Sequence, residues 1–157
     1  MDKKEVIKRL AGLRVVEGIA ATPPGSSPAG AGPAAAARLG AAIPESARDD
    51  LRLLQEAGWS IGSDPEAPFD FVLDPQGHLK IAGPALSVKF SPDLSEEGVK
   101  TVLAELDARV RRNLGFAPNS FLVETGKIPV LDVARLLNER ADVLYAEPNL
   151  IEPIQSR

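Results

Sequence analysis

The chain has 157 residues, of which 44% are hydrophobic and 25% charged, and its formal net charge of −4 argues against a nucleic-acid-binding surface. It has no cysteine, which excludes disulfides, zinc–thiolate sites and cysteine nucleophiles and fits a reducing compartment. No run approaches the roughly 18 apolar residues of a membrane span, and Arg14 and Glu17 interrupt the only candidate export signal. We therefore expect a cytoplasmic protein whose partners include neither nucleic acid nor a membrane.

Residues 1–44 are expected to form a mobile leader. Apolar residues at helical spacing predict one short helix over 3–13, which is too short to be stable alone. Residues 22–33 are rich in proline, glycine and small residues, a composition typical of a linker. The alanine-rich stretch 34–42 is expected to be partly helical.

Residues 45–84 are expected to add a helix and a β-hairpin. The helix covers 45–57, and Gly58 is a natural C-terminal stop. Strands over 69–73 and 78–82 are expected to form the hairpin. Its turn at 74–77 has proline at its second position and glycine at its fourth, as a type I turn prefers.

Residues 85–157 have the most regular pattern and are expected to form a separate domain. The elements predicted, in order, are a strand over 86–90, a helix that begins after Ser95, strands over 110–116 and 121–125, a helix that begins near Pro129, and a strand over 143–146 that Pro148 stops. The order β-α-β-β-α-β is that of the split βαβ, or ferredoxin-like, arrangement. We therefore expect an α+β fold, an antiparallel sheet with two helices on one face, whose other face meets water or a partner.

No residue pattern supports catalysis. His78 is the only histidine and is interpreted as a surface residue where the hairpin turn ends. Glu96 and Glu97 are interpreted as favourable charges at a helix N-terminus, and Trp59 as a residue that packs beneath the hairpin. The basic stretch 109–112 is interpreted as a solvated strand face in preference to a binding patch. We therefore predict that the protein is not an enzyme and has no catalytic residue, metal or cofactor.

A family resemblance extends over residues 51–154. The stretch 142–149, DVLYAEPN, looks like the close of subtilisin-family propeptides, in which a last strand with a V-x-Y-A-E-P-N signature runs into the tail that reaches the protease. LSVKF over 86–90 resembles the family's first strand, and GFAPN over 115–119 resembles its middle hairpin. EAGW over 56–59, followed by a hairpin, is similar to the segment that precedes this domain in some bacterial subtilases.

The resemblance implies an inhibitor that forms a 1:1 complex with a subtilisin-like serine protease. In this family the propeptide sheet lies against two parallel surface helices of the protease, and the C-terminal tail occupies the substrate cleft like a bound product. Carried over to this chain, the resemblance implies that these residues contact the protease: Tyr145, Glu147, Asn149, Leu150, Ile151, Glu152, Pro153, Ile154, Gln155, Ser156 and Arg157.

Residues 150–157, hereafter the C-terminal segment, are expected to act as an extended tail. Fully extended, they would reach about 26 Å at ~3.3 Å per residue, enough to add a strand to the edge of a cleft. Leu150, Ile151 and Ile154 are the apolar candidates for pockets in that cleft. By analogy with the family, the residue in the primary specificity pocket lies among 155–157.

Other functions remain open. The chain resembles a free-standing cytosolic subtilase inhibitor that acts in trans, although a propeptide segment on its own would have the same sequence. The same surfaces could serve a folding chaperone of the protease. An unrelated ferredoxin-like regulatory module, with a small molecule on its open sheet face, is a further alternative, and it predicts indifference to loss of the C-terminal segment.

Overall fold

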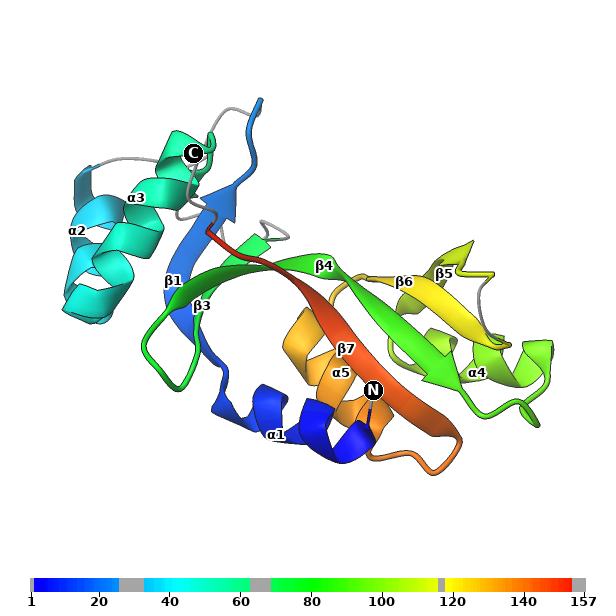
Figure 1. The fold of residues 1–157 in the computed structure, drawn as a ribbon. Coiled ribbons are helices and arrows are strands. Elements are labelled where there is room, and N and C mark those ends of the chain that lie inside the picture. The colour runs from blue at the N-terminus through cyan, green and yellow to red at the C-terminus, as the bar shows by residue number, and fades with distance from the viewer. Residues whose placement is uncertain (1, 26–32, 63–68, 116–117, 154–157) are drawn as a thin grey trace. The chain divides into compact units, whose positions relative to one another are not determined.

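The structure is a computed structural model that describes residues 2–25, 33–62, 69–115 and 118–153. Over these ranges the protein is α+β, with five α-helices and an antiparallel sheet of seven strands (Figure 1). The chain divides into two compact units: unit 1 is Met1–Ala11 with Pro84–Asn149, and unit 2 is Gly12–Gly83 with Leu150–Arg157. These units differ from the three consecutive segments expected from the sequence, because each unit combines stretches that lie far apart in the chain.

Unit 1 holds both helices and all four strands predicted for residues 85–157. Its elements are α1 (Lys3–Gly12), the second part of β4 (Leu79–Phe90), α4 (Glu96–Glu105), β5 (Ala108–Asn113), β6 (Ser120–Thr125), α5 (Val130–Asn138) and most of β7 (Val143–Ile151). The strands of this unit lie in the order β7-β4-β6-β5, so its first strand is placed between its last and its third.

One face of the unit 1 sheet is buried beneath helices. Cross-strand pairs Leu86–Val123 and Val88–Phe121 share this face, and three of these four side chains are at most 1% exposed. Figure 1 shows α4 and α5 on the same side of the strands. The apolar stripes that predict these helices are buried, namely Val99, Val102 and Leu103 on α4 and Val130, Val133, Ala134 and Leu137 on α5.

The ends of the unit 1 elements agree with their local chemistry. Ser95 is the predicted N-cap of α4, and its Oγ accepts a hydrogen bond from the Gly98 N–H at 3.0 Å. Pro129 is the N-cap of α5. β5 ends at Asn113 instead of continuing to 116, because Asn113 Oδ1 accepts the N–H of Gly115, which turns the chain with a φ of +52°. Phe116 lies outside the described residues.

The prediction that Pro148 stops the last strand is wrong, since β7 continues to Ile151. Asn138 of α5 donates to the Ala146 carbonyl and accepts the Ala146 N–H, both at 2.8 Å. The backbone groups of Ala146 therefore point away from β4, and so does the nitrogen of Pro148 two residues on. Proline is tolerated there because no neighbouring strand needs its missing N–H.

Unit 2 contains a strand that the sequence analysis does not predict. Its elements are β1 (Arg14–Thr22), α2 (Pro33–Ala42), the 3₁₀ helix η1 (Glu45–Ala47), α3 (Arg48–Glu56), β2 (Ser60–Gly62), β3 (Phe69–Leu73) and the first part of β4. β1 pairs antiparallel with β2 and β3, with a register shift between Val15 and Ala20. Part of the expected leader is thus built into unit 2, whereas 26–32 of the expected linker lie outside the described residues.

A single buried cluster forms the core of unit 2. Its fully packed members come from helices and strands alike: Val16, Ile19, Ala21, Leu39, Ile43, Ala47, Leu54, Ile61, Phe71, Leu73, Leu79 and Ile81. Trp59 packs edge-on against Phe69 with ring centroids 5.1 Å apart, which confirms its predicted role as an anchor beneath the hairpin. Gly58 has a φ of +106°, as its predicted role at the end of α3 requires.

The predicted hairpin is present, but its second strand is longer than expected. The Gly77 N–H donates to the Asp74 carbonyl at 3.0 Å and closes the turn. The strands expected separately over 78–82 and 86–90 form one strand, β4. Its partner changes from β3, up to Ala82, to β6, from Ala85, so that Pro84 lies where neither ladder needs its N–H. Within the described ranges, no helix has the length and apolarity to cross a membrane.

Candidate functional site

Among the described residues, α4 and α5 both lie on the first face of the unit 1 sheet, and neither of them covers the second face (Figure 1). Cross-strand pairs Ala85–Glu124, Ser87–Leu122 and Lys89–Ser120 alternate with the buried pairs and therefore share this second face. All except Ser120 are half-buried, in contrast to the almost fully buried residues beside them. We call this surface the open sheet face. It is the face that the sequence analysis expects to meet water or a partner.

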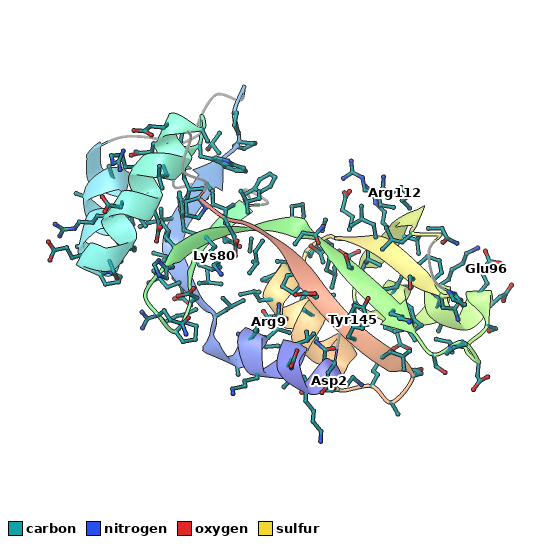
Figure 2. All side chains as sticks on the ribbon, in the orientation of Figure 1. Asp2, Arg9, Lys80, Glu96, Arg112 and Tyr145 are labelled. Carbon is teal, nitrogen blue, oxygen red and sulfur yellow. The ribbon has the colours of Figure 1, made fainter. Side chains whose placement is uncertain are left out.

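The β5 side of the open sheet face is basic. Glu124 accepts hydrogen bonds from Arg109 Nη2 and Arg111 Nη1, each at 2.9 Å. The hydrogen bond from Arg109, followed by the charges of both guanidinium groups, holds the pKa of Glu124 below its usual range. Arg112 is exposed, pairs across the strands with Leu122, and is labelled in Figure 2. Three arginines therefore accompany one carboxylate, and their exposure agrees with the solvated strand face expected for 109–112.

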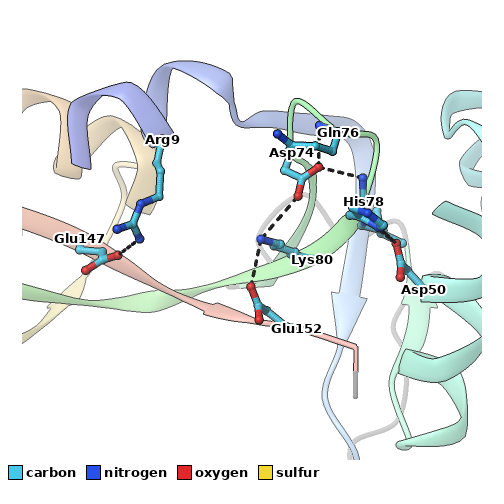
Figure 3. Close-up of polar contacts among 9 residues, drawn as sticks. Arg9, Asp50, Asp74, Gln76, His78, Lys80, Glu147 and Glu152 are labelled. Carbon is cyan, nitrogen blue, oxygen red and sulfur yellow. Dashed lines mark hydrogen bonds and ion pairs between the residues drawn. The ribbon is translucent and has the colours of Figure 1, made fainter. Parts of the chain in front are cut away.

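Three of the predicted protease-binding residues belong to unit 1. Asn149 Oδ1 lies 3.5 Å from the Ser87 hydroxyl, which places Asn149 on the open sheet face. Strand alternation puts Tyr145, labelled in Figure 2, and Glu147 on the same side of β7. Glu147 Oε1 already accepts a 2.8 Å hydrogen bond from Arg9 Nη1 of α1 (Figure 3). Sequence reasoning misses Arg9, because the two residues are 138 positions apart.

The next residues along the chain belong to unit 2 instead of forming a free tail. Leu150 and Ile151 are the last residues of β7, and Ile151 packs against the buried cluster of unit 2. Glu152 Oε1 is 3.0 Å from Lys80 Nζ, which is also 3.5 Å from Asp74 Oδ2 (Figure 3). Pro153 is half-buried. The remaining predicted residues, Ile154, Gln155, Ser156 and Arg157, lie outside the described residues.

The hairpin turn beneath this ion pair is fixed by side chains of unit 2. Asp74 Oδ1 accepts the N–H groups of Gln76 and His78, at 3.0 and 2.9 Å. His78 Nδ1 lies 3.1 Å from Asp50 Oδ2, and its side chain is 56% exposed, as expected for a residue on the surface of a turn. In the part of the chain that the structure describes, no three His, Asp or Glu side chains gather in a way that could hold a metal ion.

Comparisons with protein-family models, with curated proteins and with solved structures each find no match to this chain. The resemblance to subtilisin-family propeptides therefore depends on the sequence motifs quoted above.

Proposed function

We propose that the protein inhibits a subtilisin-like serine protease, which it binds with the open sheet face of unit 1 and with the C-terminal segment. The observation that supports this most is the β-α-β-β-α-β unit with two helices on one face. Its other face is half-exposed, and its last strand leads directly into the C-terminal segment. The strands of unit 1 lie in the order β7-β4-β6-β5. A ferredoxin-like fold would have this order, and we include a ferredoxin-like fold for unit 1 in the proposal.

The composition of the open sheet face suits a protein partner. Its centre combines small and apolar side chains, Ala85, Ser87 and Leu122, and its β5 side carries exposed arginines. An apolar centre with a charged rim is typical of protein–protein interfaces, in which arginine is enriched. The arginines would pair with carboxylates of the protease, since guanidinium groups bind carboxylates with two parallel hydrogen bonds.

The part of the C-terminal segment available to a cleft is shorter than expected from the sequence. Because β7 continues to Ile151, the part of the segment beyond this strand begins at Glu152. Extended, residues 152–157 would span about 20 Å at ~3.3 Å per residue, still enough to pair with the edge of a substrate cleft. Residues 155–157 remain our candidates for the primary specificity pocket. We propose that the protein acts in the cytoplasm as a 1:1 inhibitor, with no catalysis and no cofactor of its own.

Truncation of the C-terminal segment tests the proposal. A chain that lacks residues 154–157 keeps β7 intact, so that far-ultraviolet circular dichroism should match the full chain. We expect its inhibition constant against subtilisin to rise at least tenfold, which corresponds to about 1.4 kcal/mol. A change below about 1 kcal/mol would contradict the tail-binding mechanism and favour an unrelated ligand-binding module.

A pair of matched substitutions tests the open sheet face. Leu122→Arg places a charge at the apolar centre of this face, and we expect it to weaken inhibition by more than tenfold. Leu136→Arg makes the same change on α5, where Leu136 is 42% exposed, and should have little effect. Equal effects of the two variants would rule out docking through this face. Refolding of denatured subtilisin with and without the chain tests the chaperone alternative.

A further inference from the structure

The C-terminal segment makes two kinds of contact within unit 2. Ile151 is partly buried and packs against the apolar cluster that includes Phe71 and Ile81. One residue on, Glu152 forms the 3.0 Å ion pair with Lys80 (Figure 3). An apolar contact and an adjacent ion pair together restrict both the position and the direction of the chain at this point.

Lys80 is itself held in place by the hairpin. It pairs with Val72 across β3 and β4, and its side chain is only 21% exposed. Its second partner, Asp74 Oδ2, is 3.5 Å away, and the Asp74 side chain is 11% exposed. Because the other oxygen of Asp74 accepts two backbone N–H groups of the turn, the carboxylate cannot rotate freely. The turn therefore orients Asp74, Asp74 orients Lys80, and Lys80 orients Glu152.

We infer that Lys80 and Ile151 are positioning residues, which anchor the start of the C-terminal segment within unit 2 and set the position from which residues 154–157 would reach a protease cleft. This inference rests on the proposed function and adds a role for unit 2 in it. A segment that is already ordered up to Glu152 loses less conformational freedom when it enters a cleft, so the complex is tighter. Ile151 then faces the protein's own core and does not fill a pocket of the protease.

The first arm of the test needs no protease. ¹⁵N relaxation of the full chain reports picosecond-to-nanosecond motion of the Ile151 and Glu152 amides. We expect Lys80→Gln to lower the heteronuclear NOE of both amides. Arg52→Gln is the matched control, since Arg52 forms an exposed ion pair of the same 3.0 Å length with Glu56 elsewhere in unit 2. Unchanged NOE values in Lys80→Gln would overturn the anchor.

The second arm measures inhibition of subtilisin by the same variants. Removal of an ion pair whose Glu152 side chain is 62% exposed should weaken inhibition about twofold to fivefold in Lys80→Gln, with no change in Arg52→Gln. In a Glu152→Gln background, Lys80→Gln should then have almost no further effect, because the pair is already broken. A wild-type chain that does not inhibit overturns the proposed function and this inference together. A wild-type chain that inhibits, with Lys80→Gln equal to it or stronger, overturns the inference alone.

Discussion

Unit 1 and unit 2 both pack helices on antiparallel strands, but they differ in how polar side chains contribute. Among the described residues, both buried polar side chains, Ser120 and Asn138, lie in unit 1. Asn138 closes the outer edge of β7, and Asn119 donates to the carbonyl groups of Ser91 and Leu94 at 2.8 and 2.9 Å. Among the described residues of unit 2, the buried core consists of aliphatic and aromatic side chains, and no polar side chain is fully buried.

The difference shows that two units with similar apolar burial can fix their backbones with different polar groups. Both units bury apolar side chains from helices and strands. In unit 1 the amides of Asn119 and Asn138 also fix the backbone. In unit 2 carboxylates serve instead, since Asp74 and Asp50 accept backbone N–H groups of the hairpin. The single tryptophan, Trp59, lies in unit 2 and the single tyrosine, Tyr145, lies in unit 1, so that fluorescence can follow each unit separately.

The largest expected effect is on the core of unit 2. Phe71 is 1% exposed within the buried cluster, and Phe71→Ala should destabilise the protein by about 3–5 kcal/mol. Urea unfolding followed by far-ultraviolet circular dichroism, which reports both units, measures this. Leu144→Ala is the control in unit 1, where a side chain that is 40% exposed should change stability by no more than about 0.5 kcal/mol. Similar losses in the two variants would contradict the assignment of the cluster as the core.

An intermediate effect is expected at the buried amide of unit 1. Asn138→Ala leaves the N–H and C=O of Ala146 without their partner. At about 1–3 kcal/mol for each of these two unsatisfied groups, we expect a loss of about 2–6 kcal/mol. Ser120→Ala is the matched control, because the buried Ser120 hydroxyl has no hydrogen-bond partner among the described residues. Its removal should cost no more than about 0.5 kcal/mol. Equal losses would show that the amide hydrogen bonds contribute nothing beyond burial.

The smallest expected effect is a pH dependence of opposite sign in the two units. In unit 2, burial raises the pKa of Asp70 above its ordinary 3.8, so the folded state binds the proton more readily and stability falls as pH rises through that raised value. In unit 1, hydrogen bonds from Arg140 lower the pKa of Asp142 below 3.8. The contribution of Asp142 to folding stability is complete above pH 3.8 and is lost as pH falls through the lowered pKa.

Urea unfolding from pH 7 to pH 3 checks both signs. Asp70→Asn should stabilise the protein at pH 7, by less than about 1 kcal/mol because the site is partly solvated, and should match the wild type at low pH. Asp142→Asn should destabilise it only at the higher pH values. An Asp70→Asn variant that is less stable at pH 7 would contradict the sign for unit 2.

The elements of unit 1 between residues 85 and 146 could be predicted because their signals are local. A capping serine and apolar residues at periods of 3.6 or 2 identify them without reference to the rest of the chain. β1 could not be identified in the same way. Gly18 and the two alanines at 20 and 21 weaken its strand pattern, and its partners β2 and β3 lie far along the chain.

The residues of the candidate site also divide into those that a local motif identifies and those that only the fold brings together. The motif over 142–149 identifies Tyr145, Glu147 and Asn149, but Arg9 and Lys80 have no motif, since only the tertiary fold brings them to Glu147 and Glu152. Pro148 suggests the end of a strand because the sequence does not tell which way its nitrogen points. Only the fold shows which edge of β7 is paired, and this corrects the interpretation of Pro148.

The closed edge of β7 has a consequence for behaviour at high protein concentration. An unpaired strand edge is a template on which a second copy can add its own strand, the first step toward domain-swapped dimers and cross-β aggregates. At Ala146 the Asn138 amide already occupies both backbone groups, and at Pro148 there is no N–H to offer. An incoming strand would find no continuous ladder along this stretch, so self-association through it is disfavoured even when the protein is abundant.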